Sequence, residues 1–464
     1  MAQQQTYFEQ VYDGPWKGIN VAMPENKIEK SYTPFATNWV PRGGELRSRM
    51  RLKKFIPGLP DNSIIRGLSS FVDQNNVVHT VAISQSGVYQ LNSNWRKFPG
   101  KEWSLVYLFT SPYSLPPSPA SIQVFLNQLY FVVGDNNLYD WDGIALSTLS
   151  GLNIQGARTS TISFIVGETI TQATTGATAV VTFASQAYMN ISTLAGGGPN
   201  SSNIWTGGTS GATFKPTTVP TKGGAAVQSI AVVDTVNNLR AGAYFLGELN
   251  SRLILLNTLE QLNASGKPIS NFTQRIRWSA SGLPGIWDPT VNVDAGYNDE
   301  LDVPDSITGF LTIGRNGFVF RTNGITEMIG IASGLLPFDF NHLWASERGI
   351  GNVYPYSIAG YGPVGCFIST DDIYEISLGG FQKIGGSARN AIFSDLELQV
   401  ATPVASLFPS YRVGYPYLTY KINIPMIGGV TKNWAYFIED SSWFAWTTVN
   451  SGLETAKCIM VPTI

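Results

Sequence analysis

The densest group of residues that could perform chemistry is a run of acids in the segment VDAGYNDELDVPDS. Close carboxylates could bind Ca²⁺ through oxygen ligands, or could serve as the acid and base of glycoside cleavage. Their spacing matches no EF-hand loop, so we favour a polar connection between structural elements. The acids are Asp294, Asp299, Glu300, Asp302 and Asp305.

Histidines and cysteines are scarce. His79 in VVHTVAIS and His342 in FDFNHLWASE have apolar neighbours, which favours packed side chains over catalytic ones. Cys366 and Cys458 belong to no CxxC pair; they could form one bridge, but two buried thiols fit better. The sequence contains no GxSxG, no phosphate loop and no G-x-G-x-x-G after a strand. We therefore predict no catalytic residue, no cofactor and no metal site, and hence a protein that is not an enzyme.

One cationic row stands out, in the segment GGELRSRMRLKKF. Cations alternate there with Leu46, Ser48, Met50 and Leu52, so a strand would place four positive charges on one face. Two interpretations fit: a contact with another subunit or with phosphates, and a solvated edge strand that its charges keep soluble. The four candidate contact residues are Arg47, Arg49, Arg51 and Lys53.

The overall charge argues against general nucleic-acid binding. Charged residues make up only 13% of the 464 residues, and 30 cations against 32 anions leave a net charge of -2. Domains that bind nucleic acids are typically strongly basic. The chain starts without the pattern of a signal peptide, and no run approaches the roughly 20 apolar residues of a membrane helix. We expect no membrane span and folding in a cytoplasm.

Short alternating strands recur along the chain, separated by turns of Gly, Asn, Asp or Ser. They group into six successive meanders of about four strands. Tyr89 and Tyr139, in two third strands, lie 50 residues apart, and Trp278, Thr326 and Tyr374 follow one another at intervals of 48. Four-stranded repeats of about 40–50 residues are typical of propeller blades. The sequence therefore predicts an all-β fold, a β-propeller of about six four-stranded blades.

Two segments depart from the blade pattern. For residues 1–63 the sequence predicts an N-terminal extended arm with an entry strand. Blades 1 and 2 follow over residues 64–151. Residues 152–224 are rich in Gly, Ser and Thr, and repeat T-x-x-x-x-G-A-T at Thr171–Thr178 and Thr206–Thr213. This duplication favours a small β-domain inserted between blades over a flexible linker. The remaining blades occupy 225–464, and either the segment 457–464 or the segment 46–55 would complete a blade from the other terminus.

Several motifs in order resemble those of a family of virion proteins from tailed bacteriophages. The opening GINVAMPENKI resembles the family's entry motif, and RIRWSASGLPGIWDP (Arg275–Pro289) its R-x-R-W-S…W-x-P turn. ITGFLTIGRNGFVFRTNGITEMIG and VGCFISTDDIYEISLGGFQKIG are similar to its successive blades, and NWAYFIEDSSWFAWTTV to its final strand pair. The likeness covers most of the chain outside residues 152–224.

The resemblance implies a structural role, as the tail nozzle or hub, or DNA-stabilisation protein, of a short-tailed phage. Such β-propeller subunits form a homo-oligomeric ring, commonly a hexamer, below the portal and adaptor proteins. The ring carries tail fibres or spikes, retains the genome and then passes double-stranded DNA during ejection, without binding it specifically. The implied location is the viral tail of the virion, after synthesis in the cytoplasm of a host bacterium. Alternatives are a receptor- or glycan-binding tail component and, behind it, a propeller glycosidase acting through Asp299 or Glu300.

Overall fold

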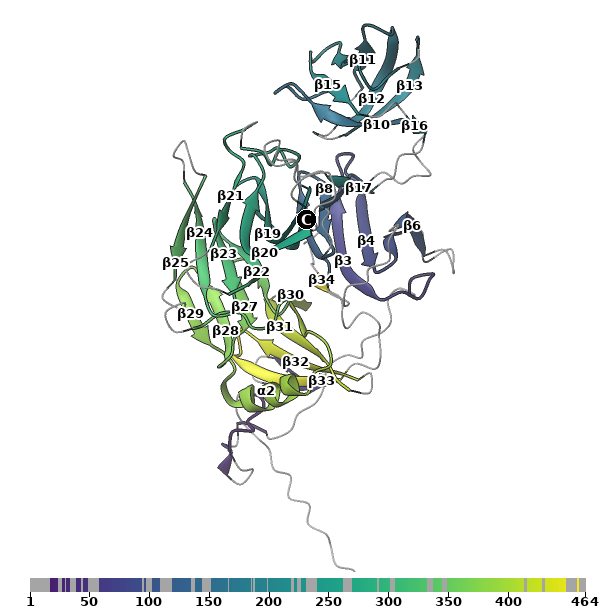
Figure 1. Ribbon diagram of the computed structural model, residues 1–464. Coiled ribbons are helices and arrows are strands. Elements are labelled where there is room, and N and C mark those ends of the chain that lie inside the picture. The colour runs from purple at the N-terminus through teal and green to yellow at the C-terminus, as the bar shows by residue number, and fades with distance from the viewer. Residues whose placement is uncertain are drawn as a thin grey trace, which may run out of the picture. The chain divides into compact units, whose positions relative to one another are not determined.

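The chain has an all-β fold of propeller blades with an inserted β-domain, as the sequence predicts (Figure 1). The computed structural model describes residues 17–458 with gaps, of which the longest are 34–38, 49–57, 97–101, 109–118, 144–151, 231–239, 262–268, 332–336, 344–348 and 448–456. Two compact units result. We call residues 1–55 with 352–455 the arm unit, and residues 56–351 with 456–464 the main unit.

Four antiparallel meanders form the blades of the main unit. Their hydrogen-bonded order follows the chain, except that the second blade takes its fourth strand from after the insertion. Tyr89, Tyr139, Trp278 and Thr326 each lie in the third strand of a blade, which confirms the repeat that the spacing predicts. The strands are β3 (Ile65–Val72), β4 (Val78–Ser84), β5 (Gly87–Leu91), β6 (Trp103–Leu108), β7 (Ser121–Phe125), β8 (Gln128–Val132), β9 (Leu138–Trp141), β17 (Val227–Ile230), β18 (Arg240–Leu249), β19 (Arg252–Gln261), β20 (Ile269–Trp278), β21 (Gly296–Asp299), β22 (Ile307–Ile313), β23 (Asn316–Arg321), β24 (Ile325–Gly330) and β25 (Phe338–His342).

Successive blades of the main unit meet through their first strands, as in a propeller. β3 lies beside β7, β7 beside β18, and β18 beside β22. The Ser121 hydroxyl accepts a hydrogen bond from the N–H of Leu246, 2.9 Å away, and so ties the second blade to the third. Apolar side chains fill the space between blades, with Phe71 and Trp141 in one cluster and Leu253 and Trp287 in the next. Each such side chain contributes roughly 2–3 kcal/mol by leaving water.

The C-terminal end returns to the first blade. Strand β34 (Lys457–Cys458) pairs in parallel with β3, with Lys457 opposite Gly67 and Cys458 opposite Leu68. The first sheet thus has five strands, β34 lying at the inner edge next to β3. Of the two segments that the sequence offers for this role, it is the one beginning at Lys457 that joins a blade of the opposite terminus.

The arm unit holds two further blades and the longest helix of the described chain. Tyr374, at the predicted interval from Thr326, again lies in the third strand of its blade. A helix packs beside the last blade, where the Asp395 carboxylate accepts a hydrogen bond from Trp434 Nε1, 2.9 Å away. The elements are β1 (Trp39–Arg42), β2 (Glu45–Ser48), β26 (Ala359–Tyr361), β27 (Val364–Ile368), β28 (Ile373–Ser377), β29 (Gly380–Lys383), η2 (Gly386–Ala388), α2 (Arg389–Glu397), β30 (Val404–Arg412), β31 (Tyr415–Pro425), β32 (Thr431–Phe437) and β33 (Ser442–Thr447).

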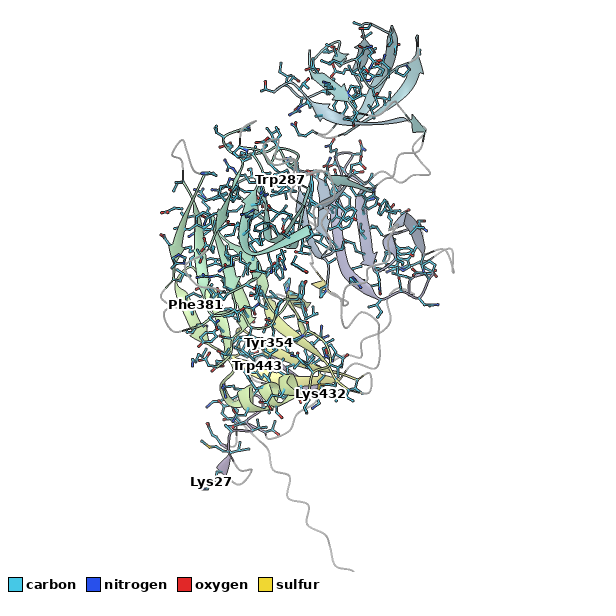
Figure 2. All side chains as sticks on the ribbon, viewed as in Figure 1. Lys27, Trp287, Tyr354, Phe381, Lys432 and Trp443 are labelled. Atoms are coloured by element: carbon cyan, nitrogen blue, oxygen red, sulfur yellow. The ribbon has the colours of Figure 1, made fainter. Side chains whose placement is uncertain are left out.

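The described part of the N-terminal arm lies against the last blade. The Ile19 side chain is 3% exposed and belongs to the core of the arm unit. Its N–H donates a hydrogen bond to the Trp443 carbonyl on β33, 3.1 Å away, and Trp443 is labelled in Figure 2. Gly18 has φ +94, and a Cβ there would lie 2.9 Å from the Trp443 carbonyl oxygen. The glycine of the GIN motif is therefore required both for its backbone conformation and for this close approach.

The segment 152–222 folds as a closed barrel. Its sheet runs β13-β12-β11-β14-β15-β10-β16, and a further pairing of β13 with β10 closes six strands into a ring. Closure removes exposed edges. The interior is apolar, with Trp205 and Phe214 both fully buried. The strands are β10 (Leu152–Arg158), β11 (Thr169–Gln172), β12 (Ala177–Ala184), β13 (Tyr188–Ala195), β14 (Trp205–Gly207), β15 (Thr213–Pro216) and β16 (Thr221–Lys222).

The position of the barrel in the chain corrects one prediction. We expected an insertion between blades, with residues 145–150 as the last strand of the second blade. Instead the barrel interrupts the second blade, whose fourth strand, β17, follows it and pairs with β9, Val227 opposite Trp141. β17 is short and follows the Gly-rich segment directly, so its sequence gave no separate strand signal. The predicted strand over 145–150 lies outside the described residues.

Excising the barrel should leave the blades folded. Its two ends are adjacent, because Leu152 pairs with Lys222 and Asn153 with Thr221, so a short linker can replace what lies between them. We expect a chain with Asn153–Lys222 replaced by a short Gly/Ser linker to stay soluble. In calorimetry it should lose one unfolding transition and keep the others. Loss of every cooperative transition would mean that the second blade needs the barrel.

Candidate functional site

The R-x-R-W-S motif forms a buried ion-pair network within the third blade. Arg275 and Arg277 are two residues apart on β20, so both side chains lie on the same face of the sheet. Arg275 binds both carboxylate oxygens of Asp299, on β21, with Nε and Nη2 each at 2.7 Å. Glu260, on β19, accepts hydrogen bonds from Arg275 Nη1 at 2.8 Å and from Arg277 Nε at 3.1 Å. One carboxylate thus joins two guanidinium groups.

Burial and charge balance make this network structural. The side chains of Glu260 and Arg277 are 0% and 1% exposed, and two cations face two anions. Burial alone would lower the pKa of Arg275, but its hydrogen bonds to Asp299 and the charges of Glu260 and Asp299 raise that pKa above its ordinary value. Arg275 also lies over the rings of Phe272 and Tyr297, at 4.0 and 4.5 Å. The hydrogen bonds of both guanidinium groups to these carboxylates lie inside the blade.

The rest of the motif holds the turn that follows β20. The Ser279 hydroxyl accepts a hydrogen bond from the N–H of Leu253 and donates one to the Ala280 carbonyl, both at 3.1 Å. The indole Nε1 of Trp287, labelled in Figure 2, donates to the Pro284 carbonyl at 2.7 Å. The motif residues therefore stabilise the blade.

The acid run is divided among separate partners, as the favoured interpretation requires. Asp294 forms an ion pair with Arg252 at 3.1 Å, and Asp299 is bound by Arg275. Within the described residues no group of three or more His, Cys, Asp or Glu side chains could hold a metal ion. Asp302 lies outside the described residues.

The two buried acids of the run face the fourth blade. Glu300 accepts hydrogen bonds from the Thr326 hydroxyl at 3.0 Å and from Asn298 Nδ2 at 2.6 Å. Asp305 accepts one from the N–H of Asn323 at 2.8 Å. Both carboxylates are at most 8% exposed. Glu300 thus joins the third blade to the fourth, whereas Asp305 holds the turn between β23 and β24 of the fourth blade.

The histidines differ from each other. His79 is buried as predicted: Nε2 lies 3.1 Å from Asp73, Nδ1 lies 2.8 Å from Gln90 Nε2, and the ring stacks on Phe71. The prediction that His342 is packed against its neighbours is wrong. Its side chain is 45% exposed, with Nδ1 3.9 Å from Glu300, because it ends the edge strand β25, where only one neighbouring strand covers it.

Cys366 is a free, buried thiol in the arm unit. Burial, aided by the charge of Glu375, raises its pKa well above the ordinary value. A protonated, inaccessible thiol is a poor nucleophile. The alternative of a bridge between the cysteines is therefore wrong, and the prediction of a buried thiol holds for Cys366.

The cationic row is only partly described. Arg47 lies in β2, opposite Val40 of β1, in the two-stranded sheet of the arm unit. Of the row, Arg47 therefore lies in a strand. Arg49, Arg51 and Lys53 lie outside the described residues, so the proposed contact of the row with a subunit or with phosphate stays a prediction.

Glu168 fixes the loop that carries the second repeat of the barrel. Its carboxylate accepts hydrogen bonds from the N–H groups of Ile165, Thr209 and Ser210, and from the Ser210 hydroxyl, at 2.7–3.1 Å. Burial alone would raise the pKa of Glu168, but these bonds outweigh it and lower the pKa below 4.5.

Replacing Glu168 with Gln should destabilise the barrel in a pH-dependent way. A carboxylate with a lowered folded pKa stabilises the fold fully above its unfolded value near 4.5, and this contribution is lost as pH falls through the folded pKa. At pH 7 we expect a loss of about 1–2 kcal/mol, or roughly 5–10 °C for a domain of this size. The difference from the wild type should shrink below pH 4.5. Calorimetry of the transition that barrel excision removes will measure it; an unchanged difference at pH 3 would contradict the assignment.

Among the residues described, no helix is long and apolar enough to span a bilayer.

Comparison with known proteins gives only weak likenesses. No protein-family model matches the chain, and no curated protein matches it. A triple mutant of AofleA from Arthrobotrys oligospora is 10% identical, with a TM-score of 0.31, over 84% of this chain and 88% of that chain. The WD40 domain of SCAP from fission yeast is 9% identical, with a TM-score of 0.26, over 74% and 69%. The intramolecular trans-sialidase from Ruminococcus gnavus is 9% identical, with a TM-score of 0.24, over 85% and 87%.

Proposed function

We propose that this chain is a structural subunit of the tail of a short-tailed bacteriophage. Copies assemble as a ring, a hexamer in our proposal, that continues the DNA channel below the portal and adaptor proteins and carries fibres or spikes. The ring retains the genome and then lets it pass. The protein is made in the bacterial cytoplasm and resides in the virion, and it is not an enzyme.

The observation that carries this proposal is that the motif residues form contacts inside the blades and between the arm and a blade. Gly18 and Ile19 of the entry motif attach the arm to the last blade. Arg275 and Arg277 of the R-x-R-W-S turn are neutralised inside the third blade. Catalytic residues would have to face a substrate, whereas these residues fix blades and arm in place. Such a pattern suits a structural protein, which acts as a rigid part of an assembly.

The charge of the chain supports a passive channel wall. A conduit must not hold DNA, and 30 cations against 32 anions provide little attraction for phosphates. The row Arg47, Arg49, Arg51 and Lys53 is the concentrated cationic segment, and we assign it to a contact with a neighbouring subunit or the adaptor.

Electron microscopy of the purified protein in negative stain tests the ring. We expect particles with an axial hole, and a variant with all four cations of the row replaced by Gln should assemble poorly while its weak DNA binding changes little. A protein that stays monomeric at all concentrations would overturn the proposal. So would tight duplex binding that the four replacements abolish, with a log–log salt slope of about −0.9 per phosphate contact.

A further inference from the structure

A band of threonines crosses the outer surface of the barrel. Thr178 on β12 pairs with Thr171 on β11, and Thr171 pairs in turn with Thr206 on β14. Thr206 pairs with Thr213 on β15, and the hydroxyls of Thr213 and Thr159 lie 2.8 Å apart. Five threonines therefore stand side by side on neighbouring chain segments, and we call them the threonine band.

Burial of the flanking residues shows that the band faces outward. Side chains alternate along each strand. Ile170 and Gln172, on either side of Thr171, are both 0% exposed, and so is Trp205 next to Thr206. Thr171 and Thr206 themselves are exposed. The inner face of the strands is thus filled by the core, and the hydroxyl and methyl groups of the band are left to the surroundings.

The rows beside the band are also small and nearly uncharged. Thr169 and Gly208 are exposed on one side of it, and Ala173 and Ile204 on the other. Lys215 is the charged residue that flanks the band, two positions from Thr213 on β15. Glu168, which directly precedes β11, is buried, and its carboxylate accepts hydrogen bonds within the barrel.

This chemistry argues against several classes of partner. Nucleic acids and anionic polymers need several Lys or Arg side chains to neutralise their charges. The cores of protein interfaces are enriched in aromatic residues, Met and Arg, and the band with its flanking rows contains none of these. What remains is a hydroxyl-rich surface with donors and acceptors repeated at the strand spacing of about 4.8 Å.

We propose that the threonine band binds a neutral polysaccharide, a ligand that repeats hydroxyl groups along its own length. Thr171, Thr178 and Thr206 each offer a hydroxyl that can both donate and accept, and Thr159 and Thr213, which share one hydrogen bond, still offer acceptors. The methyl groups offer apolar contacts to a sugar ring. The duplicated T-x-x-x-x-G-A-T motif supplies this surface, since Thr171, Thr178, Thr206 and Thr213 are the first and last residues of its two copies. The proposal is independent of ring assembly.

Electrophoresis of the full chain in native gels tests the proposal. The gels contain dextran, mannan or hydroxyethyl cellulose as neutral probes, and alginate as the anionic one. The variant Thr171→Val with Thr206→Val keeps the β-branched shape and removes two hydroxyls. The matched control is Thr161→Val with Thr217→Val, two exposed threonines outside the band.

We expect at least one neutral polysaccharide to retard the wild type. The band variant should bind it roughly tenfold or more weakly, because two hydrogen bonds are lost, while the control variant binds normally and both melt like the wild type. No retardation by any neutral probe, retardation by alginate alone, or equal binding by both variants would overturn the proposal. So would self-association in sedimentation that depends on the band. Rings in the microscope would be unaffected by either variant, so failure here leaves the tail assignment standing.

Discussion

Replacing Glu260 with Ala is expected to destabilise the main unit by about 3–5 kcal/mol, the usual cost of breaking a buried ion pair by removing one partner. Glu260 is 0% exposed and is the carboxylate within hydrogen-bonding distance of both Arg275 and Arg277. Without it the buried guanidinium of Arg277 faces no carboxylate in this network. The midpoint of thermal unfolding of the main unit should fall by several degrees, and calorimetry of the full chain will measure it.

Two further variants separate the ion pair from mere loss of packing. Asp299→Ala removes a carboxylate that is 28% exposed, and it leaves Arg275 bound to Glu260. That loss should be small, about 1 kcal/mol or less. The double variant Glu260→Leu with Arg277→Met removes both charges of the buried pair and should recover much of the stability lost in Glu260→Ala. If Glu260→Ala costs no more than Asp299→Ala, the network does not hold the blade.

The sequence predicts the blades well because their signal is local. Alternation with period two, interrupted by turn residues, needs only neighbouring positions, and the third-strand residues from Tyr89 to Tyr374 all fall in third strands. The role of Glu260 was not predictable in this way. Its partners lie 15 and 17 residues along the chain. In addition, a register shift between Leu256 and Thr258 changes which residues of β19 lie opposite which residues of β20.

The insertion and the threonine band show the same limit at a larger scale. The duplicated motif predicts a small β-domain, but not that β17 would return to the second blade, since strand order is set by tertiary contacts. The threonines were visible as a repeat. Their alignment into one outward band depends on the pairing of Thr171 with Thr206, two residues 35 positions apart whose register only the folded barrel fixes.

Replacing Gly18 with Ala is expected to release the N-terminal arm from the last blade. A Cβ at this position would lie 2.9 Å from the Trp443 carbonyl oxygen and 3.0 Å from its nitrogen, and φ is +94. An L-residue pays roughly 1–2 kcal/mol for such a conformation, and backbone atoms cannot move aside as a flexible side chain could. The bonds and burial that Ile19 gains from docking, including its N–H to Trp443, would then be lost.

Limited trypsin digestion will measure this release, because Lys17 and Lys27 lie in the arm. We expect cleavage at these sites to accelerate at least tenfold in Gly18→Ala, since the arm must leave the blade to enter a protease. Gly362→Ala is the matched control: Gly362 also has a positive φ, +60, but a Cβ there meets nothing within 4 Å. It should cost about 1 kcal/mol of stability and leave the arm protected. Equal cleavage of the two variants would show that the contact of residue 18 with Trp443 does not hold the arm, and would remove the structural role that we assign to the entry motif.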